Sequence, residues 1–116
     1  MEMLSQYFIR AEFACKCGCG FDTIDSATIE ALESIRNHFK AAVVITSACR
    51  CPEHNEAVGG TVQSLHTQGR ACDIQVQGVT PAEVQVYAQG LGISVGSYKN
   101  FTHIDTRSAG PARWEG

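Results

Sequence analysis

The amino-acid sequence predicts a small domain of the α+β class. Apolar residues recur at helical spacing in two stretches, residues 23–39 and 80–92, and short runs with the composition of strands lie between and after them. A chain of 116 residues can bury one modest core, so we expect a single domain over residues 1–116.

The first half of the chain predicts a long helix, a strand and a short helix. In residues 23–39 one helical face is apolar, and Asp25 or Ser26 can cap the helix because their side-chain oxygens accept hydrogen bonds from backbone N–H groups. The β-branched run AVVITS at residues 42–47 predicts a buried strand. In CPEHNEAVGG a short helix is expected to begin at Pro52, and the paired glycines end it.

The second half predicts a strand, a long helix and a β-hairpin. Residues 71–77, ACDIQVQ, alternate in polarity, so Asp73 should face away from the core and Cys72 toward it. The helix at 80–92 opens on TPAE, which has the pattern of a capping box. ISVGSY and FTHIDTR then flank the dipeptide Lys-Asn as two strands of a hairpin.

Composition and charge exclude several classes of function. The formal charge of −3 and the isoelectric point near 5.7 argue against a nucleic-acid partner, because basic residues are few and scattered. No apolar run approaches the roughly 18 residues of a membrane span, and the first residues lack the pattern of a secretory signal. We therefore expect synthesis in the cytoplasm and no membrane insertion, while the oligomeric state stays open.

Three polar residues form a candidate metal site. His66 precedes a turn, Asp73 begins the next strand, and His103 lies on a hairpin strand that can pair beside it; the pattern places them on exposed faces. Two imidazoles and one carboxylate suit zinc, and three protein ligands with a fourth position open are typical of a catalytic site. On the spacing alone, unrelated polar surface residues are the commoner explanation.

Three segments in order resemble the M15 metallopeptidases, the family of D-Ala-D-Ala carboxypeptidases and L-Ala-D-Glu endopeptidases. SLHTQGRACD resembles the family signature S-x-H-x-x-G-x-A-x-D, ITSACRCPEHNEAVGG resembles the segment S-G-Y-R-S-P-E-H-N, and FTHIDTR resembles the H-x-D strand. The similarity spans about residues 7–114 and is greatest to compact phage and prophage members. It implies His66, Asp73 and His103 as zinc ligands. It also implies a small antiparallel sheet with helices on one side, the fold shared with the hedgehog signalling domain.

The resemblance also implies a function and two further residues. Arg50 matches the family arginine, whose guanidinium suits a substrate carboxylate or the charge that develops on a carbonyl oxygen. Ser64 matches a position that contacts substrate, and is otherwise a turn residue. The implied protein is a zinc peptidase of the phage lysin type that cleaves peptidoglycan stem peptides, as carboxypeptidase or endopeptidase, once delivered to the wall. The alternative is a zinc-bearing binding module or phage structural module without activity.

The general base is where the sequence departs from the family pattern. Many relatives carry an acid three residues before the last histidine ligand, and this chain has Asn100 there, which cannot accept a proton. Asp105 shares a strand face with His103 and is the nearest acidic candidate for the catalytic role. It is equally a candidate for orienting the His103 ring. His54 is a third candidate base.

The six cysteines and three aromatic residues leave alternatives open. A disulfide between the N-terminal loop and residues 49–51 and a set of reduced or metal-bound thiols are equally compatible with the spacings in CKCGC and CRC, so a second metal is possible. Cys72 is expected in the core. Trp114 either walls the cleft or covers a sheet edge, and Tyr98 and Phe101 either contact a peptide or pack across strands.

Overall fold

The computed structural model describes residues 2–61 and 64–116, and its elements follow the predicted order. These elements are η1 (Arg10–Phe13), α1 (Ser26–Phe39), β1 (Val43–Ser47), α2 (Pro52–Ala57), η2 (Leu65–Gln68), β2 (Ala71–Val76), α3 (Pro81–Gly90), β3 (Ser94–Ser97), β4 (Thr102–Asp105) and β5 (Arg113–Glu115). Helices that pack on a single five-stranded sheet confirm the α+β class.

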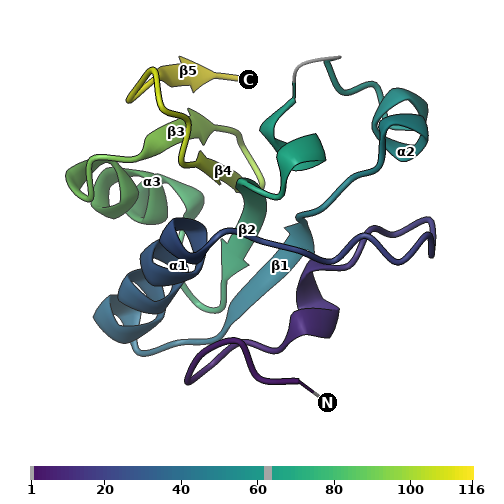
Figure 1. Ribbon diagram of the computed structural model, residues 1–116. Coiled ribbons are helices and arrows are strands. Elements are labelled where there is room, and N and C mark those ends of the chain that lie inside the picture. The colour runs from purple at the N-terminus through teal and green to yellow at the C-terminus, as the bar shows by residue number, and fades with distance from the viewer. Residues whose placement is uncertain (1, 62–63) are drawn as a thin grey trace.

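The sheet has the strand order β1-β2-β4-β3-β5 (Figure 1). The first four strands pair antiparallel, as expected, and β3 and β4 form the predicted hairpin. The expectation of a purely antiparallel sheet is corrected at one edge, because β5 pairs parallel to β3. After β4 the chain turns back and passes to the far side of β3, so β5 runs antiparallel to β4 and parallel to β3. No sequence pattern predicted this strand.

The two long helices, α1 and α3, cover one face of the sheet, and the core lies between them and the strands (Figure 1). Leu32 and Ile35 of α1 meet Ile74 of β2 and Ile104 of β4 in this core. Cys72 is fully buried there, as predicted. The short helix α2 lies apart from both, beside η2 (Figure 1).

The described helices are all too short to span a bilayer as an apolar segment.

Side-chain caps fix where the long helices begin. Asp25 is the N-cap of α1, and its carboxylate accepts a hydrogen bond from the backbone N–H of Thr28 at 3.1 Å. Thr80 caps α3 in the same way, with its hydroxyl oxygen 3.3 Å from the backbone nitrogen of Glu83. Both starts agree with the sequence, because capping depends on residues that are adjacent in the chain.

Candidate metal centre and active site

Three side chains converge on the sheet face that α1 and α3 leave uncovered. Asp73 of β2 and His103 of β4 are register partners on neighbouring strands, and η2 brings His66 beside them. His103 Nδ1 lies 2.9 Å from Asp73 Oδ1, and His66 Nε2 lies 3.3 Å from the same oxygen. One ligand atom from each residue lies within 4.8 Å of the others, so the group can hold a metal ion.

The turn around η2 places His66. Ser64 caps this turn, and its Oγ accepts a hydrogen bond from the backbone N–H of His66 at 3.2 Å. Gly69 ends the turn in the left-handed region, at φ 66°, and a Cβ there would collide with the carbonyl oxygen of Thr23. Its own carbonyl accepts a hydrogen bond from Asp25 N–H at 2.8 Å. Glycine at this position therefore lets the His66 turn dock against the start of α1.

Each histidine ring has an acceptor on its outer side. His66 Nδ1 is 2.6 Å from the carbonyl oxygen of Ala48, and His103 Nε2 is 2.8 Å from Asp105 Oδ2. A proton on each of these nitrogens leaves His66 Nε2 and His103 Nδ1 directed toward Asp73. Metal-binding histidines usually have such an outer acceptor, because it fixes the tautomer and the orientation of the ring.

The three residues are buried, which corrects the prediction that they lie on exposed faces. Their exposed fractions are 3% for His66, 8% for Asp73 and 9% for His103, because residues of η2, the hairpin and β5 surround them. Burial alone would raise the pKa of Asp73, but hydrogen bonds with His103 and His66 outweigh it and lower this pKa to about 2. The carboxylate is therefore ionised at neutral pH, the form that binds a metal.

An open pocket of about 540 Å³ lies over the cluster. It is lined by Arg50, Val58, Gly59, Gly60, Thr61, Ser64, Leu65, His66, Asp73, Tyr98, Phe101, His103, Asp105, Arg107 and Trp114. All of the predicted site residues are in this set: the three candidate ligands, Arg50, Ser64 and Asp105. The fold therefore brings these predicted residues together from four separate segments of the chain.

Arg50 lies at the edge of the cluster and contacts it directly. Its Nη2 donates to Asp73 Oδ2 at 3.3 Å, and its Nε donates to Ser47 Oγ at 3.1 Å. The backbone N–H of Arg50 also donates to the carbonyl oxygen of His66 at 3.0 Å. The guanidinium is thus held in place beside the cluster, and it retains N–H groups that can reach a substrate anion in the pocket.

Arg107 is a site residue that our sequence analysis missed. Asp105 is 1% exposed, and Arg107 donates to both of its oxygens, from Nε at 2.9 Å and from Nη2 at 2.7 Å. Burial raises the pKa of Asp105, but the hydrogen bonds from Arg107 and His103 hold it well below its usual range. The sequence did contain a signal for Arg107. Residues 103, 105 and 107 alternate with their neighbours in FTHIDTR, and an extended chain points such residues to the same side.

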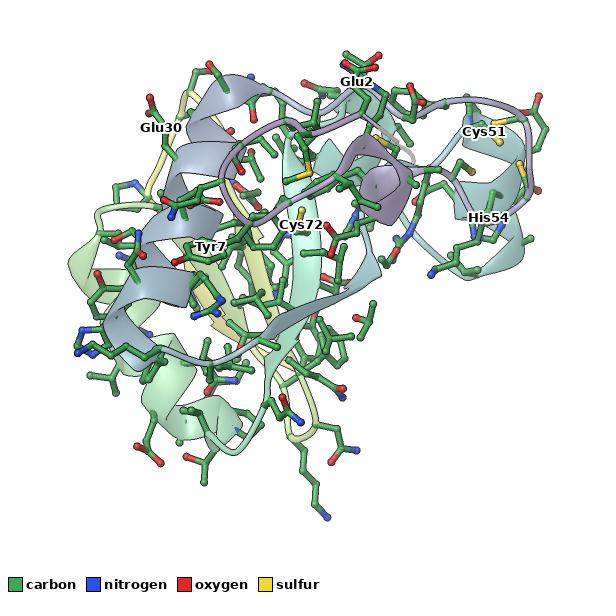
Figure 2. All side chains as sticks on the ribbon, turned by 90° about the horizontal axis from the view of Figure 1, so that it is seen from below. Glu2, Tyr7, Glu30, Cys51, His54 and Cys72 are labelled. Carbon is green, nitrogen blue, oxygen red and sulfur yellow. The ribbon has the colours of Figure 1, made fainter. Side chains whose placement is uncertain are left out.

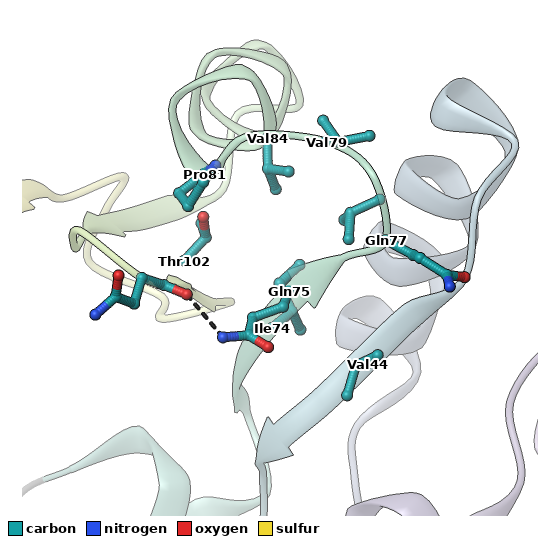
Figure 3. Close-up of a pocket in the computed structure, with 10 residues that line it drawn as sticks. Val44, Ile74, Gln75, Gln77, Val79, Pro81, Val84 and Thr102 are labelled. Carbon is teal, nitrogen blue, oxygen red and sulfur yellow. Dashed lines mark hydrogen bonds between the residues drawn. The ribbon is translucent and has the colours of Figure 1, made fainter.

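Asn100 lies outside the pocket over the cluster. It lines a second cavity of about 460 Å³ near the end of β2, together with Val44, Ile74, Gln75, Val76, Gln77, Val79, Pro81, Val84 and Thr102 (Figure 3). The backbone carbonyl of Asn100 accepts a hydrogen bond from Gln75 Nε2 at 2.8 Å. His54 is likewise absent from the described lining of the pocket over the cluster. Of the three positions considered for the general base, Asp105 is the one that lines the pocket over the cluster.

Aromatic side chains form one wall of the pocket. The rings of Tyr98 and Phe101 stack at a centroid distance of 4.4 Å, so they pack across the hairpin and line the pocket at the same time. Trp114 both covers a sheet edge and walls the pocket. It belongs to the edge strand β5, and its ring centroid is 5.1 Å from that of His103. Gly96 lies under the indole, and a Cβ there would approach it to 2.6 Å.

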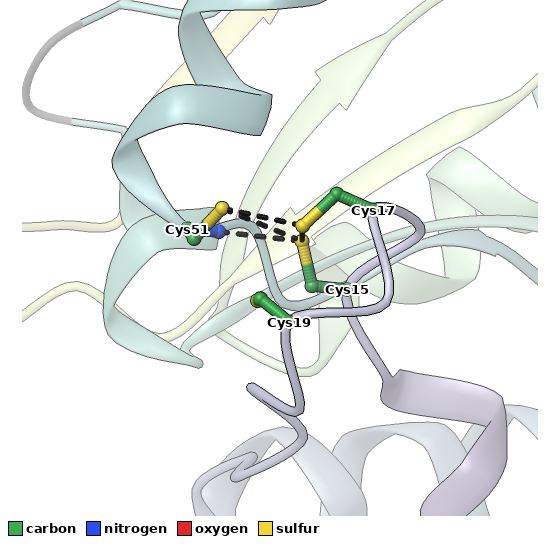
Figure 4. A group of neighbouring side chains, drawn as sticks. All are labelled: Cys15, Cys17, Cys19 and Cys51. Atoms are coloured by element: carbon green, nitrogen blue, oxygen red, sulfur yellow. Dashed lines mark hydrogen bonds between the residues drawn. The ribbon is translucent and has the colours of Figure 1, made fainter.

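The six cysteines divide into two groups, and each is a free thiol. Cys49 and Cys72 are buried in the core. The other four converge on one point outside the pocket, with their sulfurs within 4.8 Å of one another: Cys15, Cys17, Cys19 and Cys51 (Figure 4). Of the two alternatives left open by the sequence, the disulfide between the N-terminal loop and residues 49–51 is not formed, although that is where the two loops meet.

Two imidazoles and a carboxylate beside an open pocket are typical of a catalytic metal site. Comparison with protein families matches residues 6–105 to Peptidase M15, and the chain therefore belongs to the peptidase M15 family. The resemblance in the three sequence segments is thus confirmed, and membership indicates a peptidase that acts on a peptide substrate. Comparison with curated proteins finds no significant match.

Proposed function

We propose that the protein is a zinc-dependent peptidase in which His66, Asp73 and His103 hold one zinc ion. The observation that carries this proposal is the convergence of three ligand atoms, within 4.8 Å of one another, in an open pocket. Nitrogen and oxygen ligands of a tetrahedral zinc lie ~3.3 Å apart, because each is about 2.0–2.1 Å from the metal. The separations of 2.9 and 3.3 Å from Asp73 Oδ1 to the two rings fit this donor set.

When bound, zinc supplies Lewis acidity, which makes water a nucleophile near neutral pH and polarises the scissile amide. The protein's own residues do the rest. In this proposal Asp105 orients His103 rather than acting as base, because both of its oxygens already accept hydrogen bonds from His103 or Arg107. Of the two roles considered for Asp105, the geometry favours orientation of the ring.

Arg50 and Ser64 are proposed to bind the substrate. The guanidinium of Arg50 is charged at all relevant pH values and suits a substrate carboxylate or the negative charge that develops on the carbonyl oxygen. Ser64 Oγ accepts from His66 N–H, so its own O–H remains free to donate to a substrate carbonyl. Arg107 also lines the pocket, with its charge paired to Asp105. When zinc occupies the cluster and takes up the charge of Asp73, the two guanidinium groups suit a peptide substrate that carries carboxylates.

We propose peptidoglycan stem peptides as the substrate, cleaved by removal of a terminal D-Ala or between L-Ala and D-Glu. Both reactions present a carboxylate near the scissile bond, which agrees with the two arginines that line the pocket. The similarity of the sequence to compact phage and prophage members supports a cell-wall lytic enzyme that reaches the wall during lysis or from the virion. The alternative is a zinc-bearing module that binds without cleaving.

The test is release of new amino groups from purified peptidoglycan and from synthetic stem peptides, with product masses to identify the bond. Wild-type protein should release them and His66→Ala should not. His38→Ala is the matched control, because His38 is exposed on α1 and far from the cluster. Zinc bound without release of amino groups would overturn the proposed peptidase activity and favour the binding module. Cleavage at another bond would overturn the proposed substrate.

A further inference from the structure

The four cysteines outside the core come from two segments that lie far apart in the sequence. Three belong to one loop, CKCGC at residues 15–19, and the fourth, Cys51, is the N-cap of α2. Figure 2 shows Cys51 at the edge of the molecule, well apart from Cys72 in the core. Their convergence therefore belongs to neither the hydrophobic core nor the pocket over the His66 cluster (Figure 4).

The separations between the sulfurs match thiolate ligands of one metal ion. Cys15 Sγ is 3.4 Å from Cys17 Sγ and 3.9 Å from Cys51 Sγ, and Cys17 Sγ is 3.5 Å from Cys51 Sγ. A disulfide needs about 2.05 Å. Four sulfurs around a tetrahedral zinc lie ~3.8 Å apart, because each Zn–S bond is about 2.3 Å. The cluster therefore has the spacing of a metal–thiolate site.

The backbone around the cluster already directs N–H groups at the sulfurs. Cys51 N–H donates to Cys15 Sγ at 3.4 Å, and His54 N–H donates to Cys51 Sγ at 3.4 Å. The loop reverses direction through Gly18, which adopts φ 80° and whose N–H donates to the carbonyl oxygen of Cys15 at 3.1 Å. These contacts shape the loop so that three cysteines close together in sequence can face one point.

The loop is anchored at Cys15, which is buried and whose backbone N–H donates to the carbonyl oxygen of Phe21 at 2.8 Å. Residues 16–20 are all exposed and belong to no helix or strand. Cysteine is among the most commonly buried residue types, so the exposure of Cys17 and Cys19 requires an explanation. A metal that joins this loop to Cys51 would supply the missing cross-link.

We propose that Cys15, Cys17, Cys19 and Cys51 bind a second zinc ion with a structural role. Four protein ligands leave no open position for water or substrate, which is the arrangement of structural zinc. Each cysteine binds as a thiolate, and its proton is released to solvent. The ion fixes the loop at 15–19 to the start of α2, directly after Arg50, and so holds the substrate-binding arginine in place. The proposal does not depend on the peptidase activity.

The test is the zinc content per chain of the purified full-length protein, measured by elemental analysis for five proteins. Wild type should hold about two zinc ions, His66→Ala and Cys51→Ser about one each, and the double variant none. Cys49→Ala is the matched control, since Cys49 is two residues from Cys51 but buried in the core, and it should keep both ions. Loss of all zinc in His66→Ala would overturn the proposal.

A second measurement applies if Cys51→Ser does not fold. In the His66→Ala protein, a mercurial reagent should release the remaining zinc as about four thiols are modified, and cobalt in its place should give the strong charge-transfer absorption of tetrahedral thiolate ligands. An intact mass lower by two hydrogens per disulfide, without zinc, would overturn the proposal, as would iron in the cluster. Peptidoglycan hydrolysis is scored separately, so the two proposals fail independently.

Discussion

The two candidate metal clusters of this molecule are built in opposite ways. Sheet register and a capped turn bring together His66, Asp73 and His103, all buried, and place them beside an open pocket. The cysteine cluster joins an exposed loop to the start of a short helix. The first offers three candidate ligands and room for a substrate, and the second offers four candidate ligands. Ligand number and access therefore distinguish a catalytic role from a structural role.

The two clusters also differ in the contacts that hold them in place without a metal. The strands and the docked turn hold the first cluster in place through contacts that need no metal, such as the bond from Asp25 N–H to the Gly69 carbonyl at 2.8 Å. The cysteine loop is anchored mainly at Cys15, whose backbone N–H donates to the carbonyl oxygen of Phe21 at 2.8 Å, and its residues 16–20 are exposed. We therefore expect loss of the first ion to abolish activity and leave the fold intact, and loss of the second to weaken the fold.

The largest expected effect is on catalysis in His66→Ala. Activity on stem peptides should fall by at least roughly 10³-fold, because zinc contributes several kcal/mol to the barrier and each 1.36 kcal/mol is tenfold. The near-ultraviolet circular dichroism should remain that of a folded protein, and the melting temperature should fall less than in Cys51→Ser. An equal or larger drop in melting temperature would contradict the comparison, since the first cluster would then support the fold as much as the second. His38→Ala controls for loss of an imidazole.

The next effect is on stability in Cys51→Ser. Zinc present at about 1,000 times its Kd stabilises a fold by about 4 kcal/mol, so the free energy of unfolding in denaturant should fall by about that amount. Serine keeps a side-chain acceptor at the N-cap of α2, so the loss reports the metal rather than the cap. A strong chelator should destabilise wild type in the same way and destabilise the variant less. Equal losses in Cys49→Ala and Cys51→Ser would contradict the structural zinc.

A smaller effect, on zinc affinity, is expected in Asp105→Asn, which removes the charge of the side chain. If Asp105 orients His103, Asp105→Asn should weaken zinc binding by roughly 10–100-fold, and excess zinc should restore much of the activity. If it acts as the base, zinc content should stay the same, and excess zinc should not restore the lost activity. Asp22→Asn is the control, because Asp22 lies in the loop before α1 and outside the pocket lining.

The sequence predicted the features that depend on neighbouring residues. The cap at Asp25, the alternation of β2 and the β3–β4 hairpin are local, and alternation already placed His103 and Asp105 on one face. Features that depend on pairing between distant segments were not predictable in this way. The parallel contact of β5 with β3 is set by tertiary packing and leaves no periodic pattern in the sequence. The cysteine spacings allowed the 15–19 loop to meet residues 49–51, but they left open whether a disulfide or four converging thiols would result.

The smallest expected effect is that of Asn100→Asp, which places an acid three residues before His103. Asn100 lines the cavity near the end of β2, and its carbonyl is held by Gln75 at 2.8 Å, so a carboxylate there would lie outside the pocket over His66 and His103. We expect kcat/KM on stem peptides, the zinc content and the pH profile to match those of wild type. A rise in kcat with a new acidic limb in the pH profile would show that the hairpin turn reaches the site during catalysis, and the base would then be sought there rather than at Asp105.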